Sequence, residues 1–587
     1  MGAHIEDLIQ QWLDLDRNDV TRQEIQTLWD DQNLSELQKR LGTRIEFGTA
    51  GLRGRMEAGS QVCSGLCAYV LQVVQEAKPR GVVIGHDHRH NSERWARLTA
   101  SVFVREGVQA YLLGLRYCIY SCSVPFSVST LGAACGYDNG YKVYWENAVQ
   151  IIGPHDEGIA AAIQDNLVPR DWDMSILDRS PLCINNVEEM RRGYFTSLHH
   201  LSSSSLTNHA CPIKFVNTSM HGVSHGFVAQ AFEIYNFPPF VSVPKQRDPD
   251  PDFPTVKFPN PEEKEADECA ASYVLAQDPD SDRFSCAEKL PNGQWKVFSG
   301  DQIGTLLAAW TLDCFKRSGE RVVAMVASTV SSKMIGSMAR AEGFRFVESL
   351  TGFKYIGNVA LQLEKSSHTV IFGYEEAIGF MLGSKIRDKD GVAATMCFAE
   401  MVAHLHPKPA SAYLDELYEK YGYFQTSNSY FICSDPSTVD RIFAHLRKYN
   451  VEANNGPAVY PKQIAGLPIT RVRDLTVGHA YDSINWPSFQ PDMPLSGGHM
   501  TTFWAKAEGK DEDLGITLTI RRVSIYSHIY LYLIIHLSRT SGTEPKIKYY
   551  LEGSGSDRDS VALLVSAVIE ELGRDWMEVE KNRLLLP

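Results

Sequence analysis

The stretch Ala271-Ser-Tyr-Val-Leu-Ala-Gln-Asp278-Pro-Asp280-Ser-Asp282-Arg283 connects an apolar run to a turn that carries aspartates at alternate positions. The apolar run predicts a buried β-strand that ends where the acidic turn begins. Carboxylates in one tight turn can converge on a hard divalent cation. We therefore predict a metal site formed by Asp278, Asp280 and Asp282, with Arg283 adjacent to the metal.

The calcium-binding EF-hand loop also begins with D-x-D-x-D, but it requires glycine at position six and glutamate at position twelve. Arg283 and Lys289 occupy those positions, which excludes an EF-hand. Three carboxylates leave coordination positions open for water or a substrate phosphate, and this favours Mg²⁺ in phosphoryl transfer. A magnesium phosphatase with Asp278 or Asp280 as nucleophile is an alternative interpretation of the same turn.

Outward from this turn, short β-branched runs alternate with longer amphipathic stretches. GVVIG (81–85) precedes RWARLTASVFVREG (94–107), IKFVNTS (213–219) precedes GFVAQAFEIY (226–235), and VVAMVAS (322–328) precedes SSKMIGSMARAEG (331–343). This alternation predicts β-α units and mainly α/β domains. Composition places a serine-rich linker at 199–210, a long functional loop at 245–268, and further boundaries near 299–304 and 420–424.

Length and charge limit the classes of protein that fit. A chain of 587 residues predicts several domains, and a net charge of −14 argues against nucleic-acid or anionic-membrane partners. The twelve cysteines are scattered, and we expect most to be small buried hydrophobes. Residues 1–15 lack the pattern of a secretory signal, so we expect a cytoplasmic location. The apolar run 529–537 is too short for a membrane span and predicts a buried strand.

Three further motifs carry polar chemistry. Clustered hydroxyls and flanking cations in the run Arg539-Thr-Ser541-Gly542-Thr543-Glu-Pro-Lys-Ile-Lys548 can cradle an anion, although no Walker loop is present. The pair Glu375-Glu376, followed by Ala377 and later by Asp388-Lys389-Asp390-Gly391, can bind adjacent sugar hydroxyls. The glycine-spaced turn FGTAGLRG (47–54) presents Arg53.

Together and in this order, these motifs resemble the α-D-phosphohexomutase family, in particular its phosphoglucomutase-2 and phosphopentomutase branch. DNGYKVYW (138–145), NTSMHGV (217–223), STVSSK (328–333), TGFKYIGN (351–358) and the motifs above are all similar to that branch. The resemblance implies α/β architecture with three mixed-sheet α/β domains and a C-terminal α+β domain around a central cleft. We expect the domains at residues 1–205, 206–303, 304–422 and 423–587.

The resemblance also implies the reaction. A phosphoserine donates its phosphoryl group to a sugar monophosphate, the bisphosphate turns over, and the other phosphate returns to the serine. Such an enzyme needs Mg²⁺, uses a sugar bisphosphate as activator, and has a sugar phosphate as its substrate. By analogy, Glu375 holds a sugar hydroxyl, and Ala377 replaces a serine ligand, which affects sugar selection. The implied residues near the substrate or the transferring phosphate are Lys389 and Arg53 (catalytic), and Gly352, Lys354, Lys142, Arg539, Ser541, Gly542, Thr543 and Lys548 (substrate-binding).

One departure from the family falls at the nucleophile. The family places its serine in a T-A-S-H-N-P loop before D-N-G-Y-K, but here Leu131-Gly-Ala-Ala-Cys135-Gly-Tyr137 runs directly into Asp138, and no serine lies between Cys135 and Lys142. Cys135 and Tyr137 are conceivable substitutes, but neither has the neighbouring histidine and asparagine. We expect this chain to be inactive as written, and we expect the loss to disturb the sheet of the first domain.

Two other segments depart from the family. LRYCIYSCSVPF (115–126) replaces a proline- and threonine-containing element, and residues 522–538 separate a strand (516–521) from the anion cradle. Either Arg521 or Arg539 can therefore be the family's arginine, and we choose Arg539 because it adjoins the cradle. Our hypothesis is that a missing exon and a retained intron altered a mutase sequence. The sequence leaves open a catalytically dead phosphosugar-binding homologue, a glucose-1,6-bisphosphate synthase, pentose or hexose as substrate, and the oligomeric state.

Overall fold

The computed structural model describes residues 2–41, 51–55, 60–115, 127–132, 138–168, 171–255, 271–318, 322–433, 435–449, 459–482, 493–496, 498–507, 514–523 and 546–587. These residues form two compact units. The first unit contains residues 1–297, 353–358 and 379–404, and the second contains residues 298–352, 359–378 and 405–587. The candidate site residues of the sequence are divided between them: Asp278 and Lys389 belong to the first unit, and Glu375 and Lys548 belong to the second.

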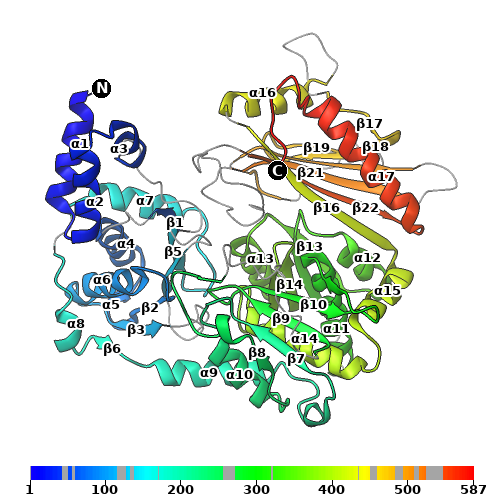
Figure 1. Cartoon of the computed structure of the whole chain (residues 1–587), viewed down its shortest axis with the longest axis horizontal. Coiled ribbons are helices and arrows are strands. Elements are labelled where there is room, and N and C mark those ends of the chain that lie inside the picture. Colours follow the sequence, from blue (N-terminus) through cyan, green and yellow to red (C-terminus); the bar gives the residue numbers. More distant parts are fainter. Residues whose placement is uncertain are drawn as a thin grey trace. The chain divides into compact units, whose positions relative to one another are not determined.

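The first unit begins with three helices that pack on one another (Figure 1). They are α1 (Gly2–Leu15), α2 (Asp19–Asp30) and α3 (Leu34–Leu41). Ile5, Ile9, Ile25 and Leu37 form their small apolar core, which is separate from the core beneath the sheet that follows. The helices are amphipathic, so this cluster explains why they associate.

The first sheet of this unit has the strand order β1-β5-β4-β2-β3-β6. Its strands are β1 (Gly51–Arg55), β2 (Val82–His86), β3 (Ala110–Leu115), β4 (Ser127–Gly132), β5 (Asp138–Tyr144) and β6 (Cys183–Ile184). The helices of this part are α4 (Ser60–Val73), α5 (Ala77–Arg80), α6 (Ser92–Arg105), α7 (His155–Asp165) and α8 (Ile176–Arg179). Strand β4 pairs with both β2 and β5, so the order of the sheet is continuous. The expected disturbance of this sheet is therefore wrong: residues 127–132 supply a strand directly before the shortened connection.

The second sheet of this unit has the order β11-β10-β9-β7-β8. Its strands are β7 (Phe215–Thr218), β8 (Val241–Ser242), β9 (Tyr273–Gln277), β10 (Phe284–Lys289) and β11 (Trp295–Val297). Helices α9 (Val187–His199), α10 (His225–Ile234) and α14 (Gly391–Leu405) accompany it, and strand β15 (Gly379–Leu382) belongs to the same unit but not to this sheet. Strand β9 runs antiparallel to β10, and the acidic turn of residues 278–283 connects the two strands.

The second unit contains a parallel sheet and a larger antiparallel sheet. The parallel strands lie in the order β13-β12-β14, from β12 (Val323–Ser328), β13 (Arg345–Ser349) and β14 (Thr369–Glu375). The helices that follow or precede them are α11 (Gly300–Ser318), α12 (Met334–Glu342), α13 (Phe353–Lys365) and α15 (Ala410–Tyr421). Residues at the carboxyl ends of parallel strands meet at one edge of a sheet, and this edge carries Ser328 and Glu375.

The antiparallel sheet has the order β16-β22-β21-β20-β18-β17, with β19 beside β18. Its elements are β16 (Tyr423–Ile432), α16 (Pro436–Arg447), β17 (Gln463–Ile464), β18 (Leu467–Asp474), β19 (His479–Asp482), β20 (Met500–Lys506), β21 (Gly515–Val523), β22 (Lys546–Gly555) and α17 (Arg558–Glu571). Ile516, Leu518 and Ile520 of β21 alternate with Thr517 and Thr519. The apolar face packs under α16 and α17 (Figure 1), and the other face is polar.

The β-α pattern of the sequence is confirmed in this structure. Strands β2, β7 and β12 coincide with the three β-branched runs, and α6, α10 and α12 follow them as expected.

All eight described cysteines are free thiols, four of them buried and four half-buried. Among the described residues, no helix is long and apolar enough to cross a membrane. The apolar run 529–537 lies outside the described residues.

The serine-rich segment 199–210 is fixed to the first unit. The buried Glu400 carboxylate of α14 accepts hydrogen bonds from Ser202 Oγ at 2.6 Å, from Ser203 N at 2.9 Å and from Ser204 N at 2.9 Å. Asn208 Nδ2 also donates to this carboxylate, at 3.1 Å. The segment is thus a connection with a defined conformation, because one buried anion satisfies several of its polar groups.

Candidate functional site

The centre of the site in the first unit is the acidic turn between β9 and β10. Asp278, Asp280 and Asp282 are buried, and each offers an oxygen such that all three ligand atoms lie within 4.8 Å of one another. Ser281 adopts a positive φ of 65°, and its N–H donates to the Asp278 carbonyl oxygen at 2.8 Å. This tight turn aims alternate side chains at one point, as the sequence spacing predicts.

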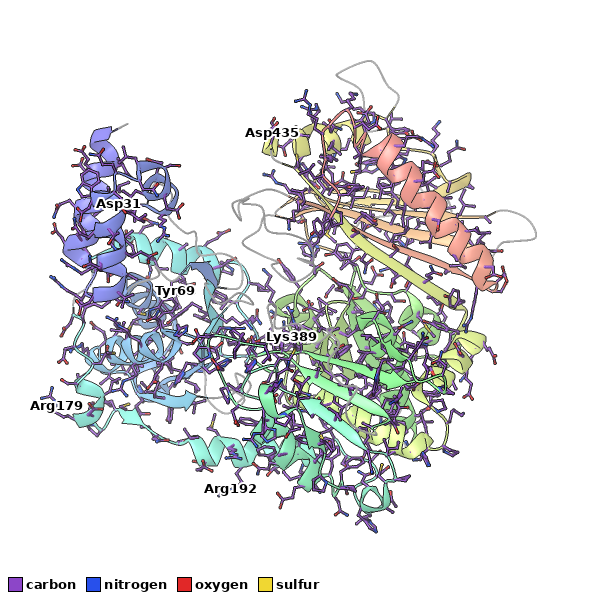
Figure 2. All side chains as sticks on the ribbon, in the orientation of Figure 1. Asp31, Tyr69, Arg179, Arg192, Lys389 and Asp435 are labelled. Carbon is purple, nitrogen blue, oxygen red and sulfur yellow. The ribbon has the colours of Figure 1, made fainter. Side chains whose placement is uncertain are left out.

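Two lysines from other segments reach the same carboxylates. Lys142 Nζ of β5 lies 3.1 Å from Asp282 Oδ2 and 3.5 Å from Asp280 Oδ2. Lys389, which is labelled in Figure 2, lies just before α14, and its Nζ is 3.6 Å from Asp282 Oδ2. Arg283 Nε lies 3.9 Å from Asp278 Oδ2, and Arg283 N donates to Asp278 Oδ1 at 2.9 Å. The structure thus brings together six residues that the sequence singled out.

The pKa values of Asp278 and Asp280 are shifted in opposite directions. Burial raises the pKa of Asp278 well above its usual range, and the charges of Asp280 and Asp282 raise it further. Burial also acts on Asp280, but Lys142, Arg89 and Lys389 overcome it and hold the pKa of Asp280 below its usual range. A buried anionic cluster of this kind is costly unless cations balance it.

The donor set fits a hard divalent cation. Asp278 Oδ2 and Asp280 Oδ1 are buried and have no hydrogen-bond donor among the residues that the structure describes. Buried carboxylate oxygens normally have a partner, so these two are available as ligands. An ion between them would also relieve the mutual repulsion that raises the pKa of Asp278. Oxygen ligands alone favour Mg²⁺ or a similar hard ion over a soft metal.

Two glycines let neighbouring segments close around the acidic turn. A Cβ on Gly391 would lie 2.2 Å from the Arg283 carbonyl oxygen, and Gly391 N donates to the Ser281 carbonyl oxygen at 3.1 Å. A Cβ on Gly222, in the NTSMHGV segment, would lie 2.4 Å from Pro279 Cα. Only glycine permits such a close backbone approach, so these residues fix the turn from two sides.

The loop after β2 contributes residues that our reading of the sequence missed. Arg89 Nη1 pairs with Asp87 Oδ2 at 2.8 Å, and both side chains are almost fully buried. Arg89 also lowers the pKa of Asp280, which places it near the acidic turn. Burial lowers the pKa of the adjacent His88 to about 4. The signal available in the sequence was a polar GHDHRH run (85–90) immediately after an apolar strand.

The second unit holds the paired glutamates. Glu375 ends β14 and is buried, and the next residue, Glu376, accepts hydrogen bonds from Ser328 Oγ at 3.1 Å and Ser331 Oγ at 3.4 Å. Burial raises the pKa of Glu376, and the carboxylate of Asp301 adds to this effect. A Cβ on Gly300 would lie 2.0 Å from the Glu376 carbonyl oxygen, so α11 can begin directly against this turn.

Cations from the antiparallel sheet face the same carboxylates. Arg521 and Lys548 lie directly opposite each other on β21 and β22, and Lys548 lowers the pKa of Glu376. Burial raises the pKa of Tyr550, which Glu376 raises further and Arg521 lowers. Lys548 thus belongs to a mixed-charge cluster within the second unit. Its neighbour on β21, Arg521, is the residue that we considered as an alternative to Arg539.

The structure describes only some of the remaining candidate site residues. Gly352 precedes α13 with a φ of 113°, a conformation that requires glycine, and Lys354 in the first turn of α13 is buried. Arg53 belongs to β1, where Gly51 pairs with Lys142, but its side chain is outside the described set. The remaining candidates, Arg539, Ser541, Gly542 and Thr543, lie outside the described residues, as do Cys135 and Tyr137.

Comparisons with known proteins agree with this geometry. Family models described as phosphoglucomutase/phosphomannomutase α/β/α domains I, II and III match residues 44–168, 192–292 and 299–421. A human phosphopentomutase is 38% identical over 629 aligned positions that cover 99% of this chain and 97% of that protein. The chain is a phosphosugar mutase homologue and belongs to the phosphoglucomutase/phosphomannomutase, or α-D-phosphohexomutase, family.

Within the family, the similarity falls in the phosphoglucomutase-2 branch. A probable phosphoribomutase of Schizosaccharomyces pombe is 37% identical and covers both chains completely, and a human glucose 1,6-bisphosphate synthase is 38% identical over 98% of this chain and 95% of its own. A solved structure of parafusin from Paramecium has a TM-score of 0.64 at 15% identity, with 92% of this chain and 96% of that chain covered. The latter likeness concerns the fold.

Proposed function

We propose that this protein descends from an intramolecular phosphotransferase that moves a phosphate between C1 and C5 or C6 of a sugar phosphate through a bisphosphate intermediate. The buried turn of Asp278, Asp280 and Asp282, with two oxygens that have no hydrogen-bond donor among the described residues, carries this proposal. Phosphoryl transfer needs little covalent chemistry from the protein beyond a nucleophile, and relies on positioning and electrostatic stabilisation. The turn and its lysines provide both.

The three aspartates would hold Mg²⁺, which when bound draws charge from the transferring phosphoryl group. Lys142 and Lys389 both approach Asp282, and this fixes their ammonium groups beside the metal position, where a phosphoryl oxygen can accept from them. Arg283 would hold the turn in shape through Asp278. Arg53 lies on the strand beside Lys142 and would complete this cationic half.

A separate group of residues would bind the sugar and the non-reacting phosphate. Glu375 is a buried acceptor at a strand end and suits a sugar hydroxyl. Gly352 and Lys354 start α13, whose N-terminus can bind an anion. Lys548 would grip the second phosphate together with Ser541, Gly542 and Thr543 and with either Arg539 or Arg521. The substrate class that fits is a pentose or hexose phosphate, with a sugar bisphosphate as activator.

The absence of the family's serine decides whether we expect this chain to catalyse the reaction. Residues 131–142 contain no serine, and the alignment with human phosphopentomutase spans 629 positions against 587 residues here, so at least 42 positions are gaps in this chain. We propose that the chain binds metal and phosphosugar without turnover. A catalytically dead binding homologue and a glucose 1,6-bisphosphate synthase are the alternatives for the parent protein. Family membership argues against the phosphatase interpretation.

A coupled assay that follows conversion of ribose 1-phosphate or glucose 1-phosphate to its isomer tests the proposal. The chain itself, a version with a T-A-S-H-N-P segment inserted after Gly136, and the same insertion with alanine in place of serine should be compared. We expect turnover only with the serine insertion. Turnover by the unaltered chain would show that a different nucleophile operates. A mutase origin is refuted if all three are inactive and Asp280→Asn leaves Mg²⁺ and sugar-phosphate binding unchanged.

We also propose a reducing, cytoplasmic location and no nucleic-acid or membrane partner; the free thiols of the described cysteines and the net charge of −14 are in keeping with this.

A further inference from the structure

The second unit contains a large cavity that the mutase reaction does not use. We call it the basic cavity. It has a volume of about 780 Å³ and lies where α12 and the edge strand β13 meet the polar face of the antiparallel sheet. Pockets for small molecules usually measure about 300–1,000 Å³. The size is therefore that of a ligand site.

The lining of the basic cavity is strongly positive. Its cations are Lys333, Arg340, Arg345, Arg471, Arg473 and Lys506. Among the described lining residues, Glu348 is the single carboxylate, which leaves an excess of five positive charges in a chain whose net charge is −14. Such a local reversal of sign focuses the potential and attracts anions.

The floor and the mouth of the cavity have different roles. On the floor, Glu348 pairs with Lys333 Nζ at 2.8 Å and with Arg473 Nη2 at 3.1 Å. Burial alone would raise the pKa of Glu348, but these two cations hold it at about 2. The negative charge of Glu348 is therefore balanced by Lys333 and Arg473. Arg345 and Lys506 at the mouth are exposed and make no ion pair with any residue that the structure describes.

The walls of the basic cavity add hydrogen-bond donors and an aromatic surface. Arg340 Nη2 lies 2.7 Å from Ser337 Oγ, and the Ser554 and Ser556 hydroxyls also line the cavity. Arg471 lies 4.5 Å from the ring centroid of Trp504, which holds the guanidinium in a fixed plane. Planar guanidinium groups recognise phosphate oxygens by paired hydrogen bonds. The aromatic wall can cover the carbon skeleton of a ligand.

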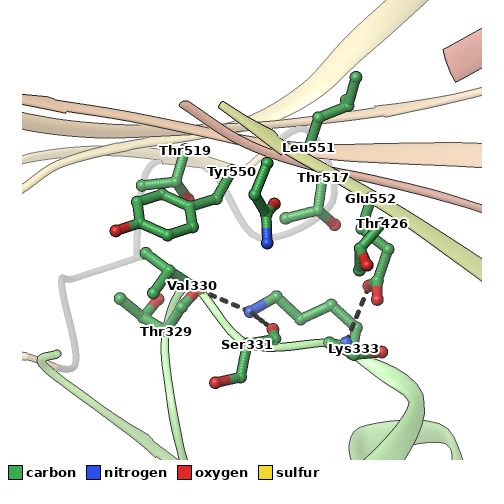
Figure 3. A pocket seen from close by; sticks show the side chains of 12 residues that line it. Thr329, Val330, Ser331, Lys333, Thr426, Thr517, Thr519, Tyr550, Leu551 and Glu552 are labelled. Atoms are coloured by element: carbon green, nitrogen blue, oxygen red, sulfur yellow. Dashed lines mark hydrogen bonds between the residues drawn. The ribbon is translucent and has the colours of Figure 1, made fainter. Parts of the chain in front are cut away.

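The basic cavity is separate from the proposed phosphate grip of the reaction. Lys548 lies near the start of β22 and Ser554 near its end, and six residues of strand correspond to roughly 20 Å. Between them, Tyr550 and Glu552 cover the Thr329–Lys333 loop, where a gap of about 10 Å³ remains (Figure 3). A ligand bound at one end therefore does not occupy the other.

We propose that the basic cavity is a second ligand site, which binds a small organic molecule carrying two phosphate groups. A nucleoside diphosphate and a sugar bisphosphate share this chemistry. Because α12 and β13 supply one wall and the antiparallel sheet the other, the ligand would tie the two sheets of the second unit together.

Binding of inorganic pyrophosphate by the full chain, followed by calorimetry and by Trp504 fluorescence, tests this inference. The Arg345→Glu/Lys506→Glu variant should bind pyrophosphate at least tenfold more weakly, because two opposed charges replace two cations. The control variant Lys214→Glu/Lys365→Glu reverses two exposed lysines elsewhere and should bind like the parent. The Lys548→Ala variant should keep the affinity, and Trp504→Phe should lose the fluorescence change.

Two results would overturn the proposal: equal affinity in the parent and the Arg345→Glu/Lys506→Glu variant, or loss of all pyrophosphate binding in Lys548→Ala. The latter would place the probe in the proposed catalytic half. Adenosine diphosphate and fructose 1,6-bisphosphate, titrated into the Lys548→Ala variant, then distinguish the two sources, since the true ligand should exceed pyrophosphate in affinity. If neither exceeds it, the claim of an organic ligand is refuted.

Discussion

The buried carboxylate of Glu552 should make the free energy of unfolding depend on pH, and a single substitution should remove this dependence. It lies on the polar face of β22, is 6% exposed, and its Oε1 accepts from Lys333 N at 2.8 Å. Burial, together with the nearby Asp301 carboxylate, raises the pKa of Glu552 from 4.5 to about 7. The adjoining gap of about 10 Å³ has room for at most one water molecule, so solvent cannot relieve the charge.

The sign of the effect follows from proton binding. Between pH 4.5 and 7 the folded state holds a proton that the unfolded state has released, so the free energy of unfolding falls as the pH rises. The difference between a pKa of 4.5 in the unfolded state and about 7 in the folded state corresponds to about 3 kcal/mol of lost stability above pH 7. Glutamine keeps the shape and the acceptor but never ionises. We therefore expect Glu552→Gln to equal the parent near pH 4 and to exceed it by up to about 3 kcal/mol at pH 8.

Scanning calorimetry across pH 4 to 8 measures this difference. At roughly 2 °C per kcal/mol, the transition that contains the antiparallel sheet should rise by about 6 °C at pH 8. Hydrogen exchange at the β22 amides gives a local readout that does not require the whole chain to unfold in one step. Glu570→Gln, on the exposed surface of α17, is the matched control. Parallel pH profiles for the parent and Glu552→Gln would refute the argument.

Three other substitutions have outcomes that the structure determines. Asp280→Asn should weaken Mg²⁺ binding at least tenfold in a titration, because it removes one of three charged ligands; unchanged affinity would contradict the metal site. Gly391→Ala should cost about 2 kcal/mol or more in urea unfolding because of its contact with Arg283, whereas Gly226→Ala, which meets no atom within 4 Å, should be neutral or stabilising. Glu400→Ala should cost about 2–4 kcal/mol and raise proteolysis at 202–208, because the buried Asn208 amide and the half-buried donors of Ser202 and Ser204 lose their acceptor; equal cleavage of the parent and the variant would count against this.

The part of the site that sequence reasoning predicted is the part that is local in the chain. Asp278, Asp280 and Asp282 share one turn, so their spacing alone shows that they can converge. Lys142 and Lys389 came from the family resemblance, because nothing local connects residues 142 and 282. Asp87 and Arg89 were missed for the same reason: a buried ion pair from another strand leaves no periodic signal.

The basic cavity could not be predicted from the sequence at all. Arg340 and Arg345 belong to a helix and an edge strand of the parallel sheet, whereas Arg471 and Lys506 come from strands more than a hundred residues later. Each of these cations alone is an ordinary surface charge. Their concentration on one cavity arises from the packing of one sheet against the other, which is a property of the tertiary structure. The polar face itself was predictable from the alternation in β21, but its partner was not.

Two of the three departures from the family, the added residues 522–538 and the shortened connection after β4, have different consequences for the protein. Strands β21 and β22 pair from Gly515↔Ser554 to Val523↔Lys546, so Arg522 and Val523 extend the pairing, and the rest of the added segment lies between the two strands in the sequence. Lengthening that connection from about 6 to about 22 residues costs only about 1 kcal/mol in closure entropy. The shortened connection after β4 likewise leaves a continuous sheet, with Gly132 paired to Asn139. Neither change interrupts the strand pairing, whereas the second, by our proposal, removes the residue that would carry the phosphoryl group. The stability of this fold and its chemistry are thus separable, and a well-folded chain that binds magnesium without turnover is what the structure leads us to expect.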